Sequence, residues 1–251
     1  MRIISFVGPK GSGKDTSYEL LRDAKRVDGK ISFAGPLKAI CSEVFGLHVN
    51  LLNDPDLKEK TMKEPITLTN KHIRAIRDLC ESYVPSVTSD GIILYRANAI
   101  STVGLEGRVF TTPRQLMQII GTELIRDRVW KNWHKAAAFS EKALSKLKRT
   151  GTYAVTDLRF IDEHAFLLEK FGSFYKAFYV SRPEAEEVLL KSTHPSELET
   201  QKIRKLLTHN VIDNSGSLED LKETLKELDL GAEGTEAPLK GSRFKYASAG
   251  E

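Results

Sequence analysis

The sequence predicts an α/β protein in which a parallel β-sheet of about five strands is flanked by helices, with a mostly helical insertion and a lid. Short apolar segments rich in β-branched residues alternate with segments of helical periodicity. Such alternation is typical of a parallel sheet covered on both faces. A glycine-rich turn joins the first predicted strand to the first predicted helix.

The length and apolar content favour one large domain. A chain of 251 residues with 40% hydrophobic content can bury a sizeable core. We expect a single domain over residues 1–230, with an acceptor-side insertion at 50–110, a lid-like segment at 183–205 and a flexible tail at 231–251.

The predicted strands are short and apolar. They cover residues 2–7, 30–33, 153–156, 174–180 and about 209–213. Residues 91–95, inside the insertion, also have a β-like pattern. The first strand ends in glycines and the fourth ends in Ser181-Arg182-Pro183, as expected where a chain leaves a sheet.

The predicted helices show leucine and isoleucine at helical spacing. They cover 14–25, 37–45, 70–83, 113 onwards, about 133–148, 160–171, a short stretch after 183, and 217–228. Gly46 ends the second helix, while Thr112 and Pro113 suit the cap and the first turn of a later one. The polar segment "KSTHPSELETQKI" at 191–203 lies in the lid-like region and has no predicted element.

Composition argues against several classes of protein. The 38 basic and 34 acidic residues are interspersed, so we expect no stable nucleic-acid binding. Cys41 and Cys80 are too few for a disulfide framework, and no run approaches 18 apolar residues, so we expect no membrane association and a cytoplasmic location. His194 and His209 lack the spacing of a zinc site.

The segment "VGPKGSGKDT" at 7–16 has the pattern of a phosphate-binding loop. Gly8, Gly13 and Lys14 satisfy G-x-x-x-x-G-K between a predicted strand and a predicted helix. Glycines let the backbone curl so that its N–H groups point inward, and the helix N-terminus adds partial positive charge. The loop therefore predicts binding of a nucleoside triphosphate, with Lys14 reaching its β- and γ-phosphates.

Asp15 stands where such loops usually carry the Ser or Thr that holds Mg²⁺. It could bind the metal through a water molecule or hold an acceptor group, with Thr16 supplying the hydroxyl. Alternatively, Asp15 only complements the positive N-terminus of the helix.

Two other classes of phosphate-loop protein lack their motifs here. A GTPase would carry an Asn-Lys-x-Asp motif, but His72-Ile73 follows Asn70-Lys71. An ATPase motor would carry a strand ending in carboxylates beside a hydrolytic glutamate, and the strand at 153–156 ends instead in "TDLRF".

Five strings place the chain among the small-molecule kinases. The strings "GPKGSGKDT", "FAGPLK", "TPRQLMQIIGTELIR", "TDLRFIDE" and "VIDNSGSLEDL" resemble, in order and approximate spacing, the phage-type deoxynucleoside monophosphate kinases. The resemblance covers residues 1–48, 111–165 and 174–228, and "PRQLMQIIGTE" is its more specific string. It implies a P-loop kinase fold, ATP and Mg²⁺ as cofactors, and host-cell cytoplasm if the gene is phage-encoded. The sequence leaves open whether the protein forms a homodimer.

The resemblance also implies which residues form the site. On the ATP side these are Gly8, Lys10, Gly11, Ser12, Gly13, Lys14, Asp15 and Thr16, with Arg182 in the lid and Asn214 beside the adenine. The metal residues are Asp15, Thr16 and Asp157. The acceptor side comprises Phe33, Lys38, Arg114, Gln118, Gly121, Thr122, Trp133, Asp157, Arg159 and Glu163. The catalytic residues are Lys14, Asp15, Arg114, Asp157 and Arg159.

Residue chemistry agrees in part. On a regular helix Arg114, Gln118 and Thr122 are successive i, i+4 neighbours, and together they could clamp a phosphate and bind a base edge. Asp157 and Arg159 follow a strand of the parallel sheet, where ligands bind, or they form a plain surface ion pair. Trp133 could stack on a base or belong to the core, and Glu163 could support Arg159.

The expected reaction is transfer of the γ-phosphoryl group of ATP to a deoxynucleoside monophosphate. The alternatives are a P-loop kinase for another small phosphorylated acceptor, of phosphomevalonate or dephospho-CoA type, and a non-catalytic nucleotide-binding protein.

Overall fold

The computed structural model describes residues 1–54, 56–87, 91, 93, 103–191 and 195–230. The tail at 231–251, His194 and most of the β-like piece at 91–95 lie outside the described residues. The chain divides into two compact units: Met1–Ile31 with Leu147–Glu251, and Ser32–Lys146. The expected single domain over 1–230 stays a prediction, and each unit is described separately below.

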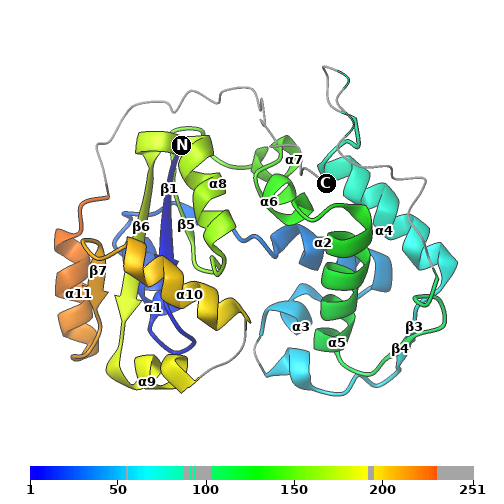
Figure 1. The fold of residues 1–251 in the computed structure, drawn as a ribbon, viewed down its shortest axis with the longest axis horizontal. Helices are drawn as coiled ribbons and strands as arrows, with labels where there is room; N and C mark the ends of the chain where they lie inside the picture. The colour runs from blue at the N-terminus through cyan, green and yellow to red at the C-terminus, as the bar shows by residue number, and fades with distance from the viewer. Residues whose placement is uncertain (55, 88–90, 92, 94–102, 192–194, 231–251) are drawn as a thin grey trace. The chain divides into compact units, whose positions relative to one another are not determined.

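The first unit contains a five-stranded parallel sheet, as predicted (Figure 1). The strands are β1 (Arg2–Val7), β2 (Gly29–Lys30), β5 (Thr152–Val155), β6 (Tyr175–Ser181) and β7 (Val211–Asp213), in the order β2-β5-β1-β6-β7. The first strand pairs with β5 on one side and β6 on the other, with Ile3 opposite both Tyr153 and Tyr175. The predicted strand at 30–33 is shorter than expected, although the amide of Ile31 still donates to Ala154.

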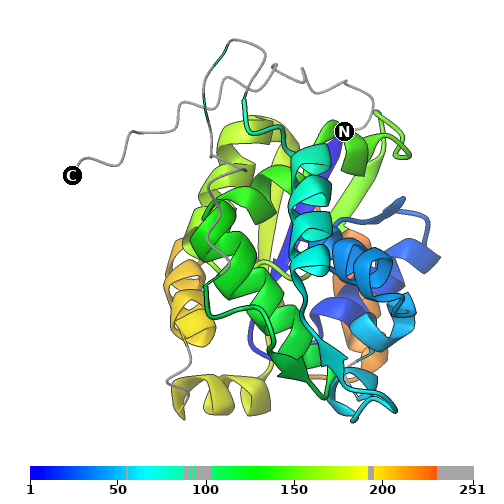
Figure 2. The same cartoon turned by 90° about the vertical axis from the view of Figure 1, so that its right-hand side faces the viewer.

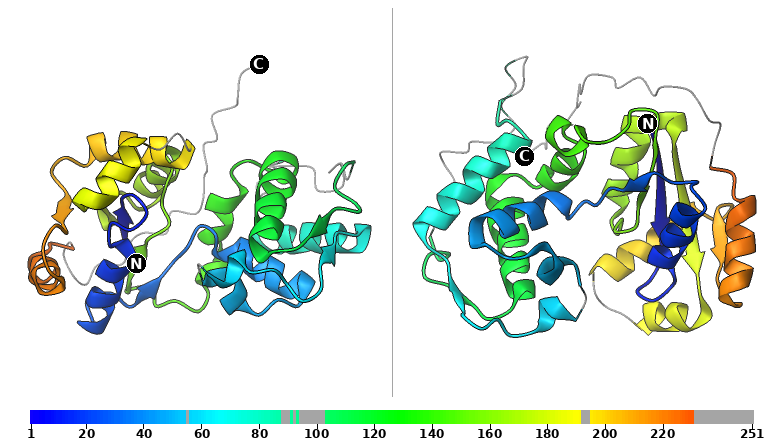
Figure 3. Two further views of the ribbon diagram at one scale, coloured as in Figure 1. Left: turned by 90° about the horizontal axis from the view of Figure 1, so that it is seen from below. Right: turned by 180° about the vertical axis from the view of Figure 1, so that it is seen from behind.

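Helices cover both faces of this sheet. The helices of this unit are α1 (Lys14–Asp23), α8 (Ile161–Phe171), α9 (Pro183–Lys191), α10 (Pro195–Leu206) and α11 (Leu218–Glu227), with a 3-10 turn at Gly172–Phe174. Ile4 and Phe6 of β1 share a buried cluster with Leu21 of α1 and Leu221 of α11. Figures 1 and 3 show α8 and α10 on the opposite face. Burial on both faces explains why these strands are continuously apolar.

The α10 helix occupies the polar segment to which no element was given. Thr200, Ile203 and Leu207 are buried, at the i, i+3, i+7 spacing of a helix face. A buried threonine in that series hides the apolar periodicity. The expected role of residues 183–205 as a lid stays a prediction.

The second unit is mainly helical. It contains α2 (Gly35–Phe45), α3 (Val49–Asn53), a 3-10 turn η1 (Leu57–Glu59), α4 (Asn70–Tyr83), α5 (Pro113–Gln118), a π-helix η3 (Ile119–Val129), α6 (Trp133–Ala138) and α7 (Glu141–Leu144). A small antiparallel sheet pairs β3 (Ile66–Thr67) with β4 (Val109–Phe110). Figure 2 views this unit from the side of α4, drawn in cyan.

Local capping explains where its helices begin and end. Gly46, in the left-handed conformation at φ 65°, ends α2 as predicted. Thr112 and Gln115 form a capping box at the start of α5, with Pro113 in the first turn. The single helix predicted over 133–148 is wrong: Ser140 accepts from the amide of Ala143 and begins a second helix.

One buried cluster holds this unit together. It includes Ile40 of α2, Leu52 of α3, Ile76 of α4, Leu116 of α5 and Trp133 of α6. In neither unit is any helix of the described residues both long enough and apolar enough to cross a membrane.

Candidate functional site

The phosphate loop lies between β1 and α1, and its conformation requires glycine at Gly13. This residue has φ 101°, and a Cβ atom there would lie 2.3 Å from Nδ2 of Asn214. That amide, which is buried, donates to the carbonyl of Ser12 at 2.8 Å. Asn214, which sequence analysis placed beside the adenine, therefore ties the phosphate loop to the end of β7.

The loop presents amide donors that have no acceptor among the described residues. Within the described residues, no group accepts from the backbone N–H of Gly11, Gly13 or Lys14. Ser12 places its hydroxyl in a buried position, also without a partner among those residues. Unused amides at the start of a helix are the donors that bind phosphate in such loops. The loop therefore fits a polyphosphate.

The ammonium group of Lys14 lies inside the curve of the loop. Its Nζ atom donates to the carbonyls of Gly8 and Pro9, at 2.7 and 2.6 Å. Burial, together with the nearby positive charge of Arg159, lowers the pKa of Lys14 to about 8. Asp15 and Glu197 oppose this shift, so these charged groups lie within electrostatic range of the loop.

Asp15 is held by two residues that sequence analysis did not identify. Its Oδ1 accepts from Nζ of Lys30 at 2.6 Å and from Oγ1 of Thr156 at 2.8 Å. Burial acts to raise the pKa of the Asp15 carboxyl, but these two hydrogen bonds and the positive charges of Lys30 and Lys14 together outweigh it, so that the pKa is lowered. Asp15 is thus an ionised group with a fixed orientation, not only a charge at the helix N-terminus.

Parallel pairing brings the ends of the strands to the same edge of the sheet. Thr156, Asp157 and Arg159 follow β5, beside the loop that follows β1. Asp157 is half-buried, whereas Arg159 is exposed. The expectation that these two residues lie at the ligand-binding edge agrees with this topology.

Glu163 supports Arg159 through the main chain. Its Oε2 accepts from the backbone N–H of Arg159 at 2.8 Å and of Phe160 at 3.0 Å, at the start of α8. Burial raises the pKa of Glu163 to about 8, while the two backbone hydrogen bonds act in the opposite direction. The Glu163 carboxyl thus fixes the backbone turn that carries Arg159, and in these two contacts it does not engage the Arg159 guanidinium.

The remaining predicted ATP-side residues lie at the surface or close to it. Arg182 is exposed at the end of β6, and its Nε pairs with Glu184 at 3.1 Å. Lys10 is exposed at the tip of the loop, and Thr16 is half-buried in the first turn of α1.

In the second unit, Arg114 and Gln118 share a face of α5. The Nε atom of Arg114 pairs with the carboxylate of Glu59, and Gln118 is exposed. Leu116 is buried on the opposite side. Thr122 is exposed too, but it lies in the π-helix that begins at Ile119, where turns are wider. The predicted i, i+4 relation therefore holds for Arg114 and Gln118, but it does not extend to Thr122.

Three other predicted acceptor residues lie in the core of this unit. Gly121 lets α2 approach, because a Cβ atom there would lie 2.7 Å from Leu37. Phe33 is buried edge to face against Phe139, with ring centroids 5.7 Å apart. Trp133 is fully buried and donates its indole N–H to the carbonyl of Cys80 at 3.2 Å. This burial favours the core interpretation of Trp133 that the sequence left open.

Lys38 is the other predicted acceptor-side cation of this unit. Its Nζ donates to Oδ1 of Asn53 at 2.9 Å. Both Lys38 and Arg114 therefore contact side chains between Asn53 and Glu59, within the region that the sequence analysis assigned to the acceptor-side insertion without naming a site residue.

No ready-made cage for a metal ion exists in the part of the chain that the structure describes: it contains no group of three His, Cys, Asp or Glu side chains placed to hold one.

Comparison with known proteins yields one family. A family model described as deoxynucleotide monophosphate kinase matches residues 2–225. The chain is 25% identical over 242 residues to the deoxynucleoside-5′-monophosphate kinase of Escherichia phage T5, covering 88% of this chain and 92% of the phage protein. It is 26% identical over 212 residues to an Acanthamoeba polyphaga mimivirus protein provisionally named deoxynucleotide monophosphate kinase, covering 81% of this chain and 84% of that one.

Proposed function

The chain belongs to the deoxynucleotide monophosphate kinase family, and on that premise we propose that it transfers the γ-phosphoryl group of ATP to the 5′-phosphate of a deoxynucleoside monophosphate. The products are ADP and the deoxynucleoside diphosphate. The family match over residues 2–225 is the observation that carries this proposal, and the phosphate loop supplies the chemistry.

The first unit binds ATP. The unused amides of Gly11, Gly13 and Lys14 donate to the phosphate oxygens, and the ammonium of Lys14 exchanges its loop carbonyls for the β- and γ-phosphates. Arg159 adds positive charge close to Lys14, which supports a role in offsetting the charge of the transferring group.

Mg²⁺ bound with ATP would neutralise charge on the β- and γ-phosphates. The hydroxyl of Thr16 and the carboxylates of Asp15 and Asp157 are the groups that would hold it. The carboxylate of Asp15 would contribute through Oδ2 or through a water molecule, because its Oδ1 already accepts from Lys30 and Thr156.

The second unit binds the acceptor. The guanidinium of Arg114 can grip the 5′-phosphate with two parallel hydrogen bonds, and Gln118, on the same face of α5, can bind a base edge. The attacking group is a phosphate oxygen that is already anionic, so no strong general base is needed. Catalysis consists of bringing two phosphates into line and offsetting their repulsion.

The test is an acceptor panel. Purified protein is mixed with ATP, Mg²⁺ and each of dAMP, dCMP, dGMP and dTMP, with the ribonucleotides in parallel, and the nucleotide products are separated. We expect at least one deoxynucleoside diphosphate to form together with an equal amount of ADP. ADP release that depends on phosphomevalonate or dephospho-CoA, with no deoxynucleotide consumed, would contradict the proposal.

A further inference from the structure

We propose that Glu59 is a positioning residue for the acceptor phosphate, which it serves by fixing the guanidinium of Arg114. The segment 49–59, comprising α3 and η1, is then part of the acceptor site and not only an insertion. The proposal rests on the proposed function, since it assumes that Arg114 binds the phosphate of the acceptor nucleotide.

The contact leaves most of the guanidinium available. The Glu59 carboxylate accepts from Nε of Arg114, which is one of five N–H donors on that side chain. No other described group accepts from the two terminal nitrogens of Arg114. A guanidinium held at Nε keeps the four remaining donors for a bidentate grip on a phosphate.

The segment is built to hold Glu59 in place. Asp54 accepts from the amides of Asp56 and Leu57 at 2.8 and 2.9 Å and so begins the turn that ends at Glu59. Leu52 of α3 is fully buried in the core of the unit. A short, capped and anchored turn therefore presents the carboxylate to α5.

The same segment engages the second cation of the predicted acceptor set. Asn53, the last residue of α3, accepts from Nζ of Lys38 on α2. Asn53 and Glu59, which lie six positions apart, thus contact Lys38 on α2 and Arg114 on α5. This coincidence favours a positioning function over a chance surface contact.

Stability alone does not account for the pair. The side chains of Arg114 and Glu59 are 41% and 53% exposed, and exposed ion pairs contribute little to folding. Glu59 has two other conceivable effects, which differ in sign. As an orienting group it improves phosphate binding, whereas as a neutralising charge it weakens it.

Steady-state kinetics on two variants separates these effects. Glu59→Gln keeps an oxygen that accepts from Nε but removes the charge, and Glu59→Ala removes both. If Glu59 orients Arg114, the alanine variant should raise the KM for the best deoxynucleotide about tenfold or more, with the KM for ATP unchanged, and the glutamine variant should stay close to wild type. A glutamine variant with a clearly lower deoxynucleotide KM, or an alanine variant with wild-type KM, overturns the proposal.

A double-mutant cycle excludes a general loss of structure. If Glu59 acts through Arg114, then Glu59→Ala should have no further effect on deoxynucleotide binding in the Arg114→Ala background. An equal loss in both backgrounds contradicts the proposal. Binding of the deoxynucleotide, measured by calorimetry, supplies the readout where turnover is too slow.

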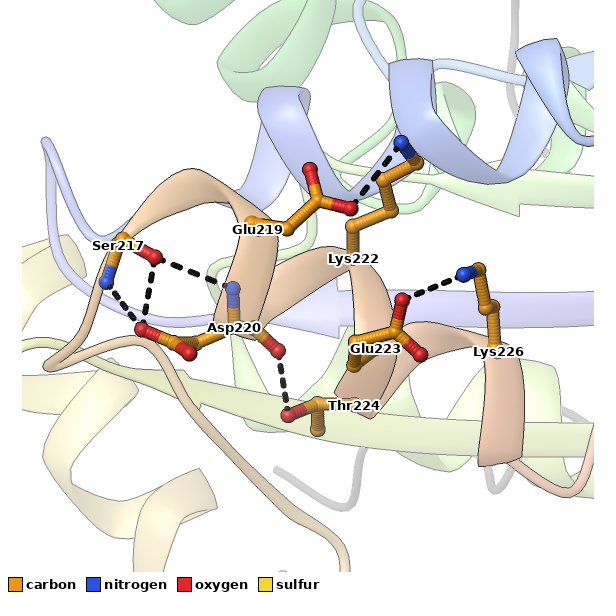
Figure 4. Close-up of polar contacts among 7 residues, drawn as sticks. All are labelled: Ser217, Glu219, Asp220, Lys222, Glu223, Thr224 and Lys226. Atoms are coloured by element: carbon orange, nitrogen blue, oxygen red, sulfur yellow. Dashed lines mark hydrogen bonds and ion pairs between the residues drawn. The ribbon is translucent and has the colours of Figure 1, made fainter.

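A matched control is available on α11. Glu223 is similarly exposed at 61%, and it pairs with Lys226 on its own helix and not with a predicted site residue (Figure 4). Glu223→Gln should change neither KM. The activity of the wild-type protein distinguishes failure of the Glu59 proposal from failure of the proposed function. If the wild type phosphorylates a deoxynucleotide and Glu59→Ala has no effect, only the positioning function of Glu59 is refuted. If the wild type phosphorylates no deoxynucleotide, the proposed function is refuted, and this inference with it.

Discussion

The phosphate loop of the first unit and the Arg114 helix of the second unit, which we propose to bind the two phosphates of the reaction, are built in different ways. The loop is made of backbone, and it is held by buried groups: Asn214 ties it to β7, and Gly13 has no room for a side chain. The helix instead presents partly exposed side chains. The most important of them, Arg114, is held by the carboxylate of Glu59 at the surface.

This difference predicts how each region tolerates change. A site made of backbone amides fails when the main chain moves, so conservative substitutions there should be costly. A site made of side chains should respond in graded steps, because each residue can be shortened or neutralised separately. Substitutions in such a side-chain site should also be able to change which acceptor is bound without affecting the binding of ATP.

The largest expected effect comes from the two arginines that we propose to offset transition-state charge. Arg159→Ala and Arg114→Ala should each lower kcat about 10³–10⁵-fold, the range seen when such arginines are removed from phosphoryl-transfer sites. Steady-state assays with the best deoxynucleotide measure this. A loss below about tenfold for both variants would remove these residues from the reacting centre.

The next largest effect tests the backbone-built loop. Gly13→Ala forces a Cβ atom against Asn214 at a positive φ, and strain of this kind costs about 1–3 kcal/mol, which corresponds to a rise of about 5- to 150-fold in the KM for ATP. Gly46→Ala is the control, because Gly46 also has a positive φ but open space around it. That variant should lose about 1–2 kcal/mol of stability and keep its KM for ATP.

The pH dependence of ATP binding should report Lys14. Its pKa in the free protein is lowered to about 8, so the ammonium is charged below that pH and loses its proton above it. Affinity for ATP should therefore fall as pH rises through 8, by up to about tenfold per unit, and binding at pH 8 should take up protons.

The variant Lys14→Arg shows which group causes the fall in ATP affinity near pH 8. Lys14→Arg stays charged throughout, so its ATP affinity should not change near pH 8. Glu163, whose pKa burial also raises to about 8, is the competing source. A step that persists in Lys14→Arg would point to Glu163 instead.

The smallest expected effect concerns Trp133. Trp133→Phe keeps an aromatic ring in the core but loses the indole hydrogen bond to Cys80, which should cost about 1–3 kcal/mol of unfolding free energy. The KM for deoxynucleotides should not change. A rise in that KM without loss of stability would restore the alternative in which Trp133 stacks on the base.

Much of the fold could be predicted because local signals and tertiary packing agree. The helix over Asn70–Tyr83 has the predicted bounds, and the cap at Thr112 and the stop at Gly46 were read from residue chemistry. The errors occurred where a polar residue hid or broke a pattern. Thr200 interrupts the apolar face of α10, and Ser140 begins a new helix within an apparently continuous stretch.

The site was harder to predict, because several of its contacts join residues distant in sequence. Lys30 and Thr156 reach Asp15 because β5 pairs with β1 and β2 pairs with β5, and nothing in either local sequence marks them. Glu59 lies in a segment without motifs and contacts a residue 55 positions away. The phosphate loop, by contrast, is contiguous, and its spacing alone predicted its place between β1 and α1, while its binding of a triphosphate stays a prediction.

The central claim is that the first unit binds the donor nucleotide and the second binds the acceptor. Calorimetric titration of a non-hydrolysable ATP analogue and of a deoxynucleoside monophosphate, each into Lys14→Ala and Arg114→Ala, tests it directly. We expect Lys14→Ala to lose at least about tenfold affinity for the ATP analogue alone, and Arg114→Ala to lose as much for the monophosphate alone. Equal weakening of both ligands by either variant would contradict this division.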